Sequence, residues 1–123
     1  MASKKILIVD DEAELLVAVQ ARLEANGYQV DTASDGEEGL KKATQGVYDL
    51  VILDVMMPKI DGYKVCATLK HDVRYVKTPV LLFTARAGEE DVRLGIEECK
   101  ADGYLTKPFE AAVLLRKIQE LIG

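Results

Sequence analysis

The sequence predicts an α/β fold in which a five-stranded parallel sheet of strand order 2-1-3-4-5 is doubly wound, with helices on both faces. Short apolar runs alternate with longer segments of helical periodicity along the chain, which is typical of parallel sheets. Three of the apolar runs are continuous, as expected for strands that helices cover on both faces. The other two runs are short or alternate with polar residues, which favours the edges of the sheet.

The composition of each run identifies a strand. Residues 6–9, 50–53 and 80–83 read Ile-Leu-Ile-Val, Leu-Val-Ile-Leu and Val-Leu-Leu-Phe, so we expect them to be the central strands. Residues 28–33 alternate apolar and polar side chains, and residues 103–106 form a short run. We therefore expect these two segments at the two edges.

Five helices are expected between and after the strands. The first ends at Asn26-Gly27, where glycine accepts a left-handed backbone, and the second begins at Asp35, with Glu38 three residues further on. No repeat, low-complexity tract or linker separates the elements, so residues 1–123 are expected to form one domain. The apolar positions at helical spacing predict the inward-facing side chains, which are Leu15, Leu16, Val19, Leu23, Val65, Cys66, Leu69, Val92, Ile96, Cys99, Leu114, Ile118 and Leu121.

Composition and charge exclude several classes of function. The 123 residues are 49% hydrophobic and 30% charged, so the chain is long enough to bury a core and is not expected to be disordered. A formal net charge of −5, without a dense Lys/Arg cluster, argues against direct binding of nucleic acid. Cys66 and Cys99 lack the spacing of a disulfide framework or zinc site, and the first apolar run is too short to span a membrane. We expect a cytoplasmic protein without membrane contact.

Polar residues follow the strands of the predicted sheet. Asp10 and Asp11 come after the first strand, Asp54 after the third, Thr84 after the fourth and Lys107 after the fifth. Each residue alone is adequately explained as a helix cap, a strand end or a solvated charge. The carboxyl ends of parallel strands share one edge, however, and three carboxylates gathered there would repel one another unless a cation lay among them.

The charge and the ligand types indicate which cation this edge would hold. Three carboxylates and one ammonium sum to −2, which a divalent ion neutralises, and the available ligands are oxygens, which favours Mg²⁺ over zinc. A hydroxyl and an ammonium beside the ion would bind phosphoryl oxygens. The sequence has no glycine-rich nucleotide loop, so the phosphoryl donor is expected to be a partner protein or a small phosphodonor.

Five sequence blocks together resemble the receiver domain of two-component response regulators, whose flavodoxin-like (βα)5 fold is that of the chemotaxis regulators. The resemblance covers essentially the whole chain. The blocks are Ile6-Leu7-Ile8-Val9-Asp10-Asp11-Glu12, Val51-Ile52-Leu53-Asp54-Val55-Met56-Met57-Pro58, Asp61-Gly62, Leu82-Phe83-Thr84-Ala85 and Tyr104-Leu105-Thr106-Lys107-Pro108-Phe109.

The resemblance implies a role for each site residue. Asp54 would be the phosphoacceptor, taking a phosphoryl group from a phosphohistidine of a sensor histidine kinase or phosphotransfer protein. Mg²⁺, for which Mn²⁺ can substitute, would be bound by Asp10, Asp11, Asp54 and the main-chain carbonyl of Met56. Thr84, the Ala85 amide and Lys107 would contact the phosphoryl group, and Pro108 would follow a cis peptide bond.

The resemblance also implies a switch. Phosphorylation adds negative charge that draws Thr84 inward, and Tyr104 would then rotate from solvent toward the core, changing the face of the fourth helix, fifth strand and fifth helix for a downstream output domain or protein. Met56 and Arg86 would border the water that removes the phosphoryl group. Lys100 stands where the family usually has glycine and would need a left-handed backbone or a different helix end.

Alternatives remain open at this point. Haloacid-dehalogenase-like phosphatases also use an aspartate nucleophile and Mg²⁺, but they need an acid two residues later, where this chain has Met56. A receiver that serves only as a scaffold and is never phosphorylated is disfavoured, because the residues required for phosphorylation are present. The chain is not expected to be an enzyme, because a receiver assists only its own phosphorylation and dephosphorylation. Whether the chain is free-standing or part of a longer regulator or hybrid kinase is undecided, as is homodimerisation through the fourth and fifth helices.

Overall fold

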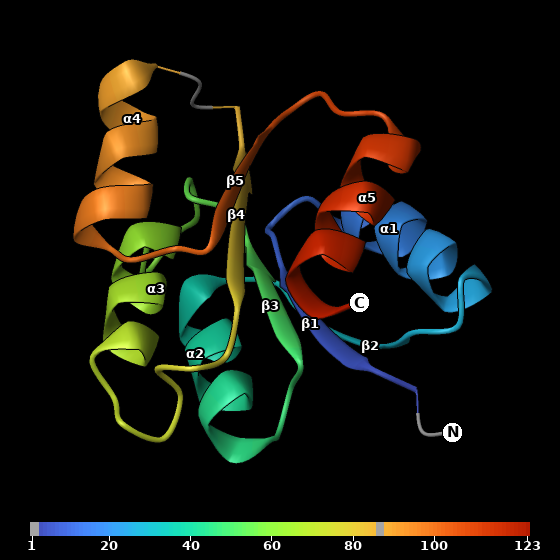
Figure 1. Cartoon of the computed structure of the whole chain (residues 1–123), viewed down its shortest axis with the longest axis horizontal. Coiled ribbons are helices and arrows are strands. Elements are labelled where there is room, and N and C mark those ends of the chain that lie inside the picture. The colour runs from blue at the N-terminus through green and yellow to red at the C-terminus, as the bar shows by residue number, and fades with distance from the viewer. Residues whose placement is uncertain (1–2, 86–87) are drawn as a thin grey trace.

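The parallel sheet has the predicted strand order, β2-β1-β3-β4-β5, in the computed structural model, which describes residues 3–85 and 88–123 (Figure 1). Each pair of neighbouring strands is parallel. The elements in chain order are β1 (Lys5–Val9), α1 (Ala13–Ala25), β2 (Gln29–Ala33), α2 (Gly36–Gln45), β3 (Leu50–Leu53), α3 (Gly62–Lys70), β4 (Val80–Thr84), α4 (Glu89–Arg93), the π-helical turn η1 (Leu94–Glu98), β5 (Gly103–Thr106) and α5 (Ala111–Ile122).

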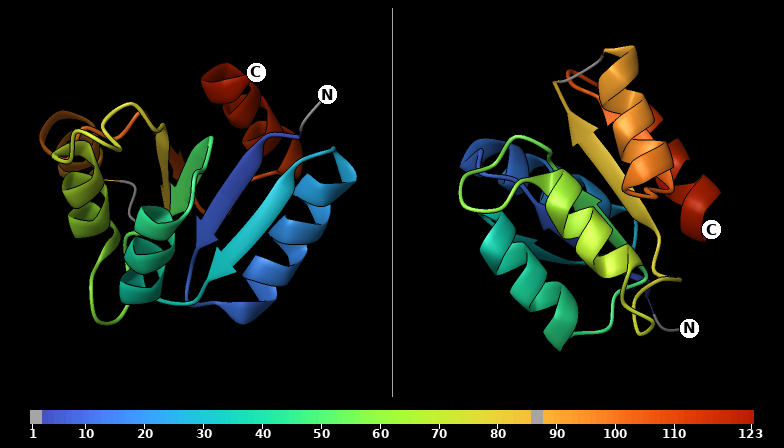
Figure 2. Two further views of the ribbon diagram at one scale, coloured as in Figure 1. Left: turned by 90° about the horizontal axis from the view of Figure 1, so that it is seen from below. Right: turned by 90° about the vertical axis from the view of Figure 1, so that its left-hand side faces the viewer.

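Helices cover both faces of the sheet. Figures 1 and 2 show α1 and α5 on one face and α2, α3 and α4 on the other. Successive side chains of a strand point to opposite faces, so Ile6 and Ile8 of β1 pack beneath α1 and α5, whereas Leu7 and Val9 pack beneath the other helices. Apart from the first residue of β1, the three central strands are fully buried, and β2 and β5 are partly exposed, as predicted for edges.

The predicted helix ends follow from local chemistry. The Asp35 side chain accepts a hydrogen bond from the Glu38 amide (2.7 Å), and the Glu38 carboxylate accepts one from the Ser34 amide (2.9 Å), which together cap α2. Gly27 follows α1 with a φ of 92°, the left-handed conformation that the sequence predicts there. No helix in residues 3–85 and 88–123 is long and apolar enough to cross a membrane.

The prediction for the fourth helix is partly wrong. The α-helix stops at Arg93, and in the π-helical turn that follows the Cys99 amide donates to the carbonyl of Leu94, five residues earlier. The wider turn rotates later side chains away from α-helical spacing, so Cys99 is buried as expected but Ile96 is exposed. Lys100 follows with a φ of 65°, the left-handed conformation expected from the sequence.

Candidate functional site

Three carboxylates meet at the carboxyl edge of the sheet. Asp10 follows β1, Asp54 follows β3, and Glu12 lies two residues after Asp10. One oxygen of each lies within 4.8 Å of the others. Asp10 and Asp54 are brought together because β1 and β3 are neighbours in register, with Val9 opposite Leu53. The arrangement follows from the strand order.

Lys107, which follows β5, supplies the positive charge of this acidic cluster. Its Nζ atom donates hydrogen bonds to Asp10 Oδ2 (2.6 Å), Glu12 Oε1 (3.0 Å) and Asp54 Oδ2 (3.3 Å). The ammonium also lies 4.9 Å from the centre of the Phe83 ring on β4. Only 12% of the Lys107 side chain is exposed, so little water screens these interactions.

Burial and pairing shift the pKa values of the cluster. Burial raises the pKa of Asp10, and the hydrogen bond from Lys107 offsets this only in part. Burial also acts to lower the pKa of Lys107, but the hydrogen bonds to Asp10 and Glu12 and the charges of Asp10 and Asp54 together outweigh it, so this pKa is raised. Lys107 therefore stays charged at neutral pH and compensates part of the negative charge around it.

Main-chain contacts fix the two buried carboxylates. Asp10 Oδ1 accepts from the Glu12 amide (2.8 Å), and Asp54 Oδ1 accepts from the Met56 amide (3.2 Å). The loop after Asp54 folds back closely, because the Gly62 amide donates to a loop carbonyl and a Cβ atom at Gly62 would lie 2.1 Å from the Asp54 carbonyl oxygen. Only glycine permits this approach.

The structure places the other predicted ligands of a metal ion at the margin of the cluster. Asp11 is exposed and lies outside the three-carboxylate group among the described residues. It lines a hollow of about 410 Å³ together with Met56 and Met57. Met56 is 54% exposed, and its apolar side chain borders the site.

The predicted phosphoryl-binding residues lie along β4 and the start of the loops that follow. Thr84 is fully buried, and its carbonyl accepts from the Lys107 amide (2.8 Å), while Ala85 is exposed. The Lys107–Pro108 peptide bond is cis, the isomer expected from the sequence. Arg86, predicted to tune dephosphorylation, lies outside the described residues.

Glu12 is the member of the cluster that sequence reasoning missed. It occupies the N-cap position of α1, yet its side chain makes no capping hydrogen bond and turns to Lys107 instead. A sequence signal exists, because an acid three residues after the end of β1 stays at the same edge. The signal is weak, since helix N-termini commonly carry acids for other reasons.

The donor set fits a magnesium ion. Asp10, Glu12 and Asp54 offer only oxygen ligands, and three carboxylates with the one ammonium of Lys107 sum to a charge of −2. Hard divalent cations prefer such oxygen donors, and Mg²⁺ commonly shares its shell with phosphate oxygens. The site is therefore suited to binding a cation together with a phosphoryl group.

Comparison with known proteins agrees with the fold and identifies the family. The family model described as the response regulator receiver domain matches residues 6–119. The chain is 45% identical over 120 residues to the alkaline phosphatase synthesis transcriptional regulatory protein PhoP of Bacillus subtilis, covering 98% of this chain and 49% of that protein. It is 41% identical over 118 residues to the DNA-binding dual master transcriptional regulator RpaA of Synechocystis, covering 96% and 48%. The chain thus spans about half the length of these relatives.

Solved structures extend the similarity. The chemotaxis response regulator CheY4 of Vibrio cholerae superposes with a TM-score of 0.91 at 34% identity, covering 98% of this chain and 99% of that one. The response regulator TrrA of Thermotoga maritima, solved in complex with Mg(2+)-BeF, gives a TM-score of 0.85 at 37% identity, covering 96% and 98%. By its acidic cluster, fold and matched sequence, the chain belongs to the response regulator receiver domain family.

Proposed function

We propose that this chain is a signalling switch in which Asp54 accepts a phosphoryl group from the phosphohistidine of a sensor histidine kinase or phosphotransfer protein. An Asp54 carboxylate oxygen attacks phosphorus, the bond from phosphorus to the histidine nitrogen breaks, and an acyl phosphate forms. The observation that carries the proposal is the buried Asp54 carboxylate, held within 3.3 Å of the Lys107 ammonium in an acidic cluster. The transferred phosphoryl group would therefore arrive between the Lys107 ammonium and the Asp54 carboxylate, which are already in place.

The remaining site residues have separate roles in the proposal. Asp10, Asp11, Asp54 and the main-chain carbonyl of Met56 would hold Mg²⁺ or Mn²⁺, and the related TrrA was solved with Mg(2+)-BeF. The ion when bound supplies charge neutralisation to the transferring phosphoryl group. Glu12 joins this set because it belongs to the same oxygen cluster.

Three further groups are placed to contact phosphoryl oxygens. The Lys107 ammonium points into the cluster and would exchange a carboxylate partner for a phosphoryl oxygen. Thr84, buried at the end of β4, and the Ala85 amide beside it would donate hydrogen bonds. The protein acts on its own aspartate, so we propose a phosphoacceptor rather than an enzyme with separate substrates.

Phosphorylation would change the charge on Asp54 from −1 to about −2, and this added charge is the signal. We propose that Thr84 and Tyr104 carry it to the face formed by α4, β5 and α5. A downstream output domain or protein would read that face, and a homodimer would form through α4 and α5. Related regulators of transcription are about twice as long as this chain, which supports an output segment as the reader. We also propose that residues 1–123 form a single domain located in the cytoplasm. This domain would bind neither nucleic acid nor a membrane.

Phosphorylation by acetyl phosphate in the presence of Mg²⁺ tests the proposal directly. Intact-mass spectrometry should show the addition of one phosphoryl group to the wild type, and none to Asp54→Asn or after chelation of the metal. Asp49→Asn is the matched control, because Asp49 lies at the opposite end of β3 and accepts only a main-chain hydrogen bond from Lys5 (2.7 Å) among the described residues. Unmodified wild type, or equal modification of Asp54→Asn, would overturn the assignment.

A further inference from the structure

A tyrosine hydroxyl connects three elements beside the site. Tyr63 lies in the first turn of α3, and its hydroxyl donates a hydrogen bond to the main-chain carbonyl of Asp91 in α4 (2.9 Å). The same oxygen lies 3.3 Å from the hydroxyl oxygen of Tyr104 on β5. A hydrogen bond between the two hydroxyls takes its proton from Tyr104, because the Tyr63 proton is directed to Asp91.

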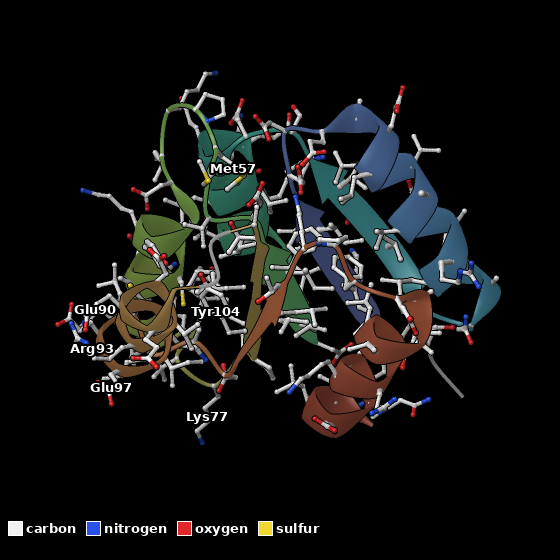
Figure 3. All side chains as sticks on the ribbon, turned by 90° about the horizontal axis from the view of Figure 1, so that it is seen from above. Met57, Lys77, Glu90, Arg93, Glu97 and Tyr104 are labelled. Carbon is white, nitrogen blue, oxygen red and sulfur yellow. The ribbon has the colours of Figure 1, made fainter. Side chains whose placement is uncertain are left out.

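The Tyr104 ring occupies an inward position in this structure. Figure 3 shows it between α4 and the sheet, and the ring is half-buried against the core. Gly95 in η1 makes room for it, since a Cβ atom there would lie 3.1 Å from two ring carbons. The starting position expected from the sequence, with the ring in solvent, is therefore not the one observed.

Ion pairs connect α4 to η1 on the outer side of the segment that Tyr63 contacts. Arg93 pairs with Glu90 (3.1 Å), Glu97 (3.6 Å) and Glu98 (3.4 Å), and these ion pairs join α4 to η1 across the change of helix type. Figure 3 shows Glu90, Arg93 and Glu97 on the outer surface of this segment. The hydrogen bond from Tyr63 to the Asp91 carbonyl therefore also restrains the backbone that packs over Tyr104.

We propose that Tyr63 is a positioning residue whose hydroxyl keeps Tyr104 inward in the unphosphorylated chain, and that it thereby sets how readily the chain takes up a phosphoryl group. The inference rests on the proposed function, in which the phosphorylated form favours an inward Tyr104. A ligand that prefers one conformation binds more tightly when that conformation is already populated. Tyr63 raises this population through the contact of its hydroxyl with that of the inward Tyr104 ring.

Tyr63→Phe keeps the ring and removes only the hydroxyl. Loss of one hydrogen bond of ordinary strength corresponds to about a fivefold change in an equilibrium constant. We expect Tyr63→Phe to bind beryllofluoride, in the presence of Mg²⁺, more weakly than the wild type by up to about fivefold, because affinity falls in proportion to the inward fraction. Tyr75→Phe is the matched control, because the Tyr75 hydroxyl also donates to a main-chain carbonyl, that of Thr44 (2.7 Å), which belongs to α2 and not to α4 or β5.

A second measurement, made without beryllofluoride, separates this inference from the proposed function. In chains with isotopically labelled tyrosine rings, NMR should show the Tyr104 resonances moving toward solvent-exposed values in Tyr63→Phe but not in Tyr75→Phe. A wild type that fails to bind beryllofluoride overturns the proposed function and the uptake role of Tyr63 with it. Binding that is equal in both variants, or a Tyr104 ring undisturbed by Tyr63→Phe, overturns the role of Tyr63 alone.

Discussion

Replacing Lys107 by methionine tests whether the lysine compensates buried negative charge. Methionine keeps a long apolar side chain near Phe83 and removes the ammonium, so the change is mainly one of charge. The cluster then carries three carboxylates and a net charge of −3 in place of −2. Asp10 and Asp54 are buried, whereas the Glu12 side chain is 62% exposed.

The buried members of the cluster decide the size of the effect. Breaking a buried ion pair by removing one partner costs about 3–5 kcal/mol, whereas an exposed pair is worth about 1 kcal/mol or less. The contact of Lys107 with Glu12 thus contributes little to the loss of unfolding free energy, and the contacts with Asp10 and Asp54 contribute most of it. Because methionine retains the apolar packing, we expect the free energy of unfolding at about pH 7 to fall by about 3 kcal/mol.

The pH dependence of this loss identifies its electrostatic origin. The pKa of Asp10 is already raised by burial above its ordinary 3.8, and removal of the Lys107 hydrogen bond raises it further. A carboxyl with a raised pKa in the folded state takes up a proton before the unfolded chain does. Stability is therefore regained as the pH falls through the folded-state pKa, and the deficit of Lys107→Met relative to the wild type should shrink at about pH 5.

Urea unfolding followed by circular dichroism measures both quantities. Lys117→Met is the control, because the Lys117 side chain is 41% exposed and pairs only loosely with Glu120 (3.8 Å), so stability should change by less than about 0.5 kcal/mol. A loss below about 1 kcal/mol for Lys107→Met at pH 7, or an equal loss at both pH values, would refute the charge argument.

Four other changes have defined outcomes. Met56→Asn should shorten the lifetime of the acyl phosphate, followed by mass spectrometry, because the exposed apolar Met56 cannot orient a water; a longer lifetime would contradict this. Lys100→Gly should raise the free energy of unfolding by about 1 kcal/mol, since the left-handed φ of 65° suits glycine, and urea unfolding checks the sign. Gly36→Ala should lower the same free energy by about 2–3 kcal/mol, because a Cβ atom there would lie 1.7 Å from the Ile60 carbonyl oxygen and the loop must shift; unchanged stability would show that it moves freely. Burial, with a hydrogen bond to a carboxylate, raises the pKa of Tyr48 to about 12. The neutral phenol therefore stabilises the folded chain fully below pH 10, and this stabilisation is lost as the pH rises toward 12. The loss of stability between about pH 9 and pH 11, measured by unfolding, should be smaller in Tyr48→Phe than in the wild type.

The sheet was predictable because its signals are local. A continuously apolar run such as residues 50–53 can be stable only between two helical layers, and the alternation in residues 28–33 leaves one face for solvent. The π-helical turn was not predictable in this way. Periodicity analysis assumes 3.6 residues per turn, so it places Ile96 inward, whereas the turn actually directs Gly95 to the core. Glycine has no hydrophobic side chain, so a hydropathy pattern cannot show that this position faces the core.

The same distinction divides the site. The meeting of Asp10, Asp54 and Lys107 follows from parallel topology, which gathers the carboxyl ends of the strands at one edge. Parallel topology does not decide which of the neighbouring acids Asp10 and Asp11 enters the cluster. Asp10 directly follows β1 and is buried in the cluster, while Asp11 is exposed and lines the neighbouring hollow. Glu12 reaches the site only through a side-chain conformation, which periodicity does not encode.

Strand order also explains why the positive charge comes from a lysine. Neighbouring strands lie about 4.8 Å apart, and β4 separates β5 from β3, so a group on β5 must reach across roughly 10 Å to meet Asp54. The long Lys107 side chain does this, and its ammonium lies over Phe83 of β4 on the way. A phosphoryl group on Asp54 would pull on Lys107 from β5 and on Thr84 from β4 at once. In the proposed switch, β5 is therefore coupled to the site through Lys107 as directly as through Tyr104, and an altered output face is a consequence of the topology itself.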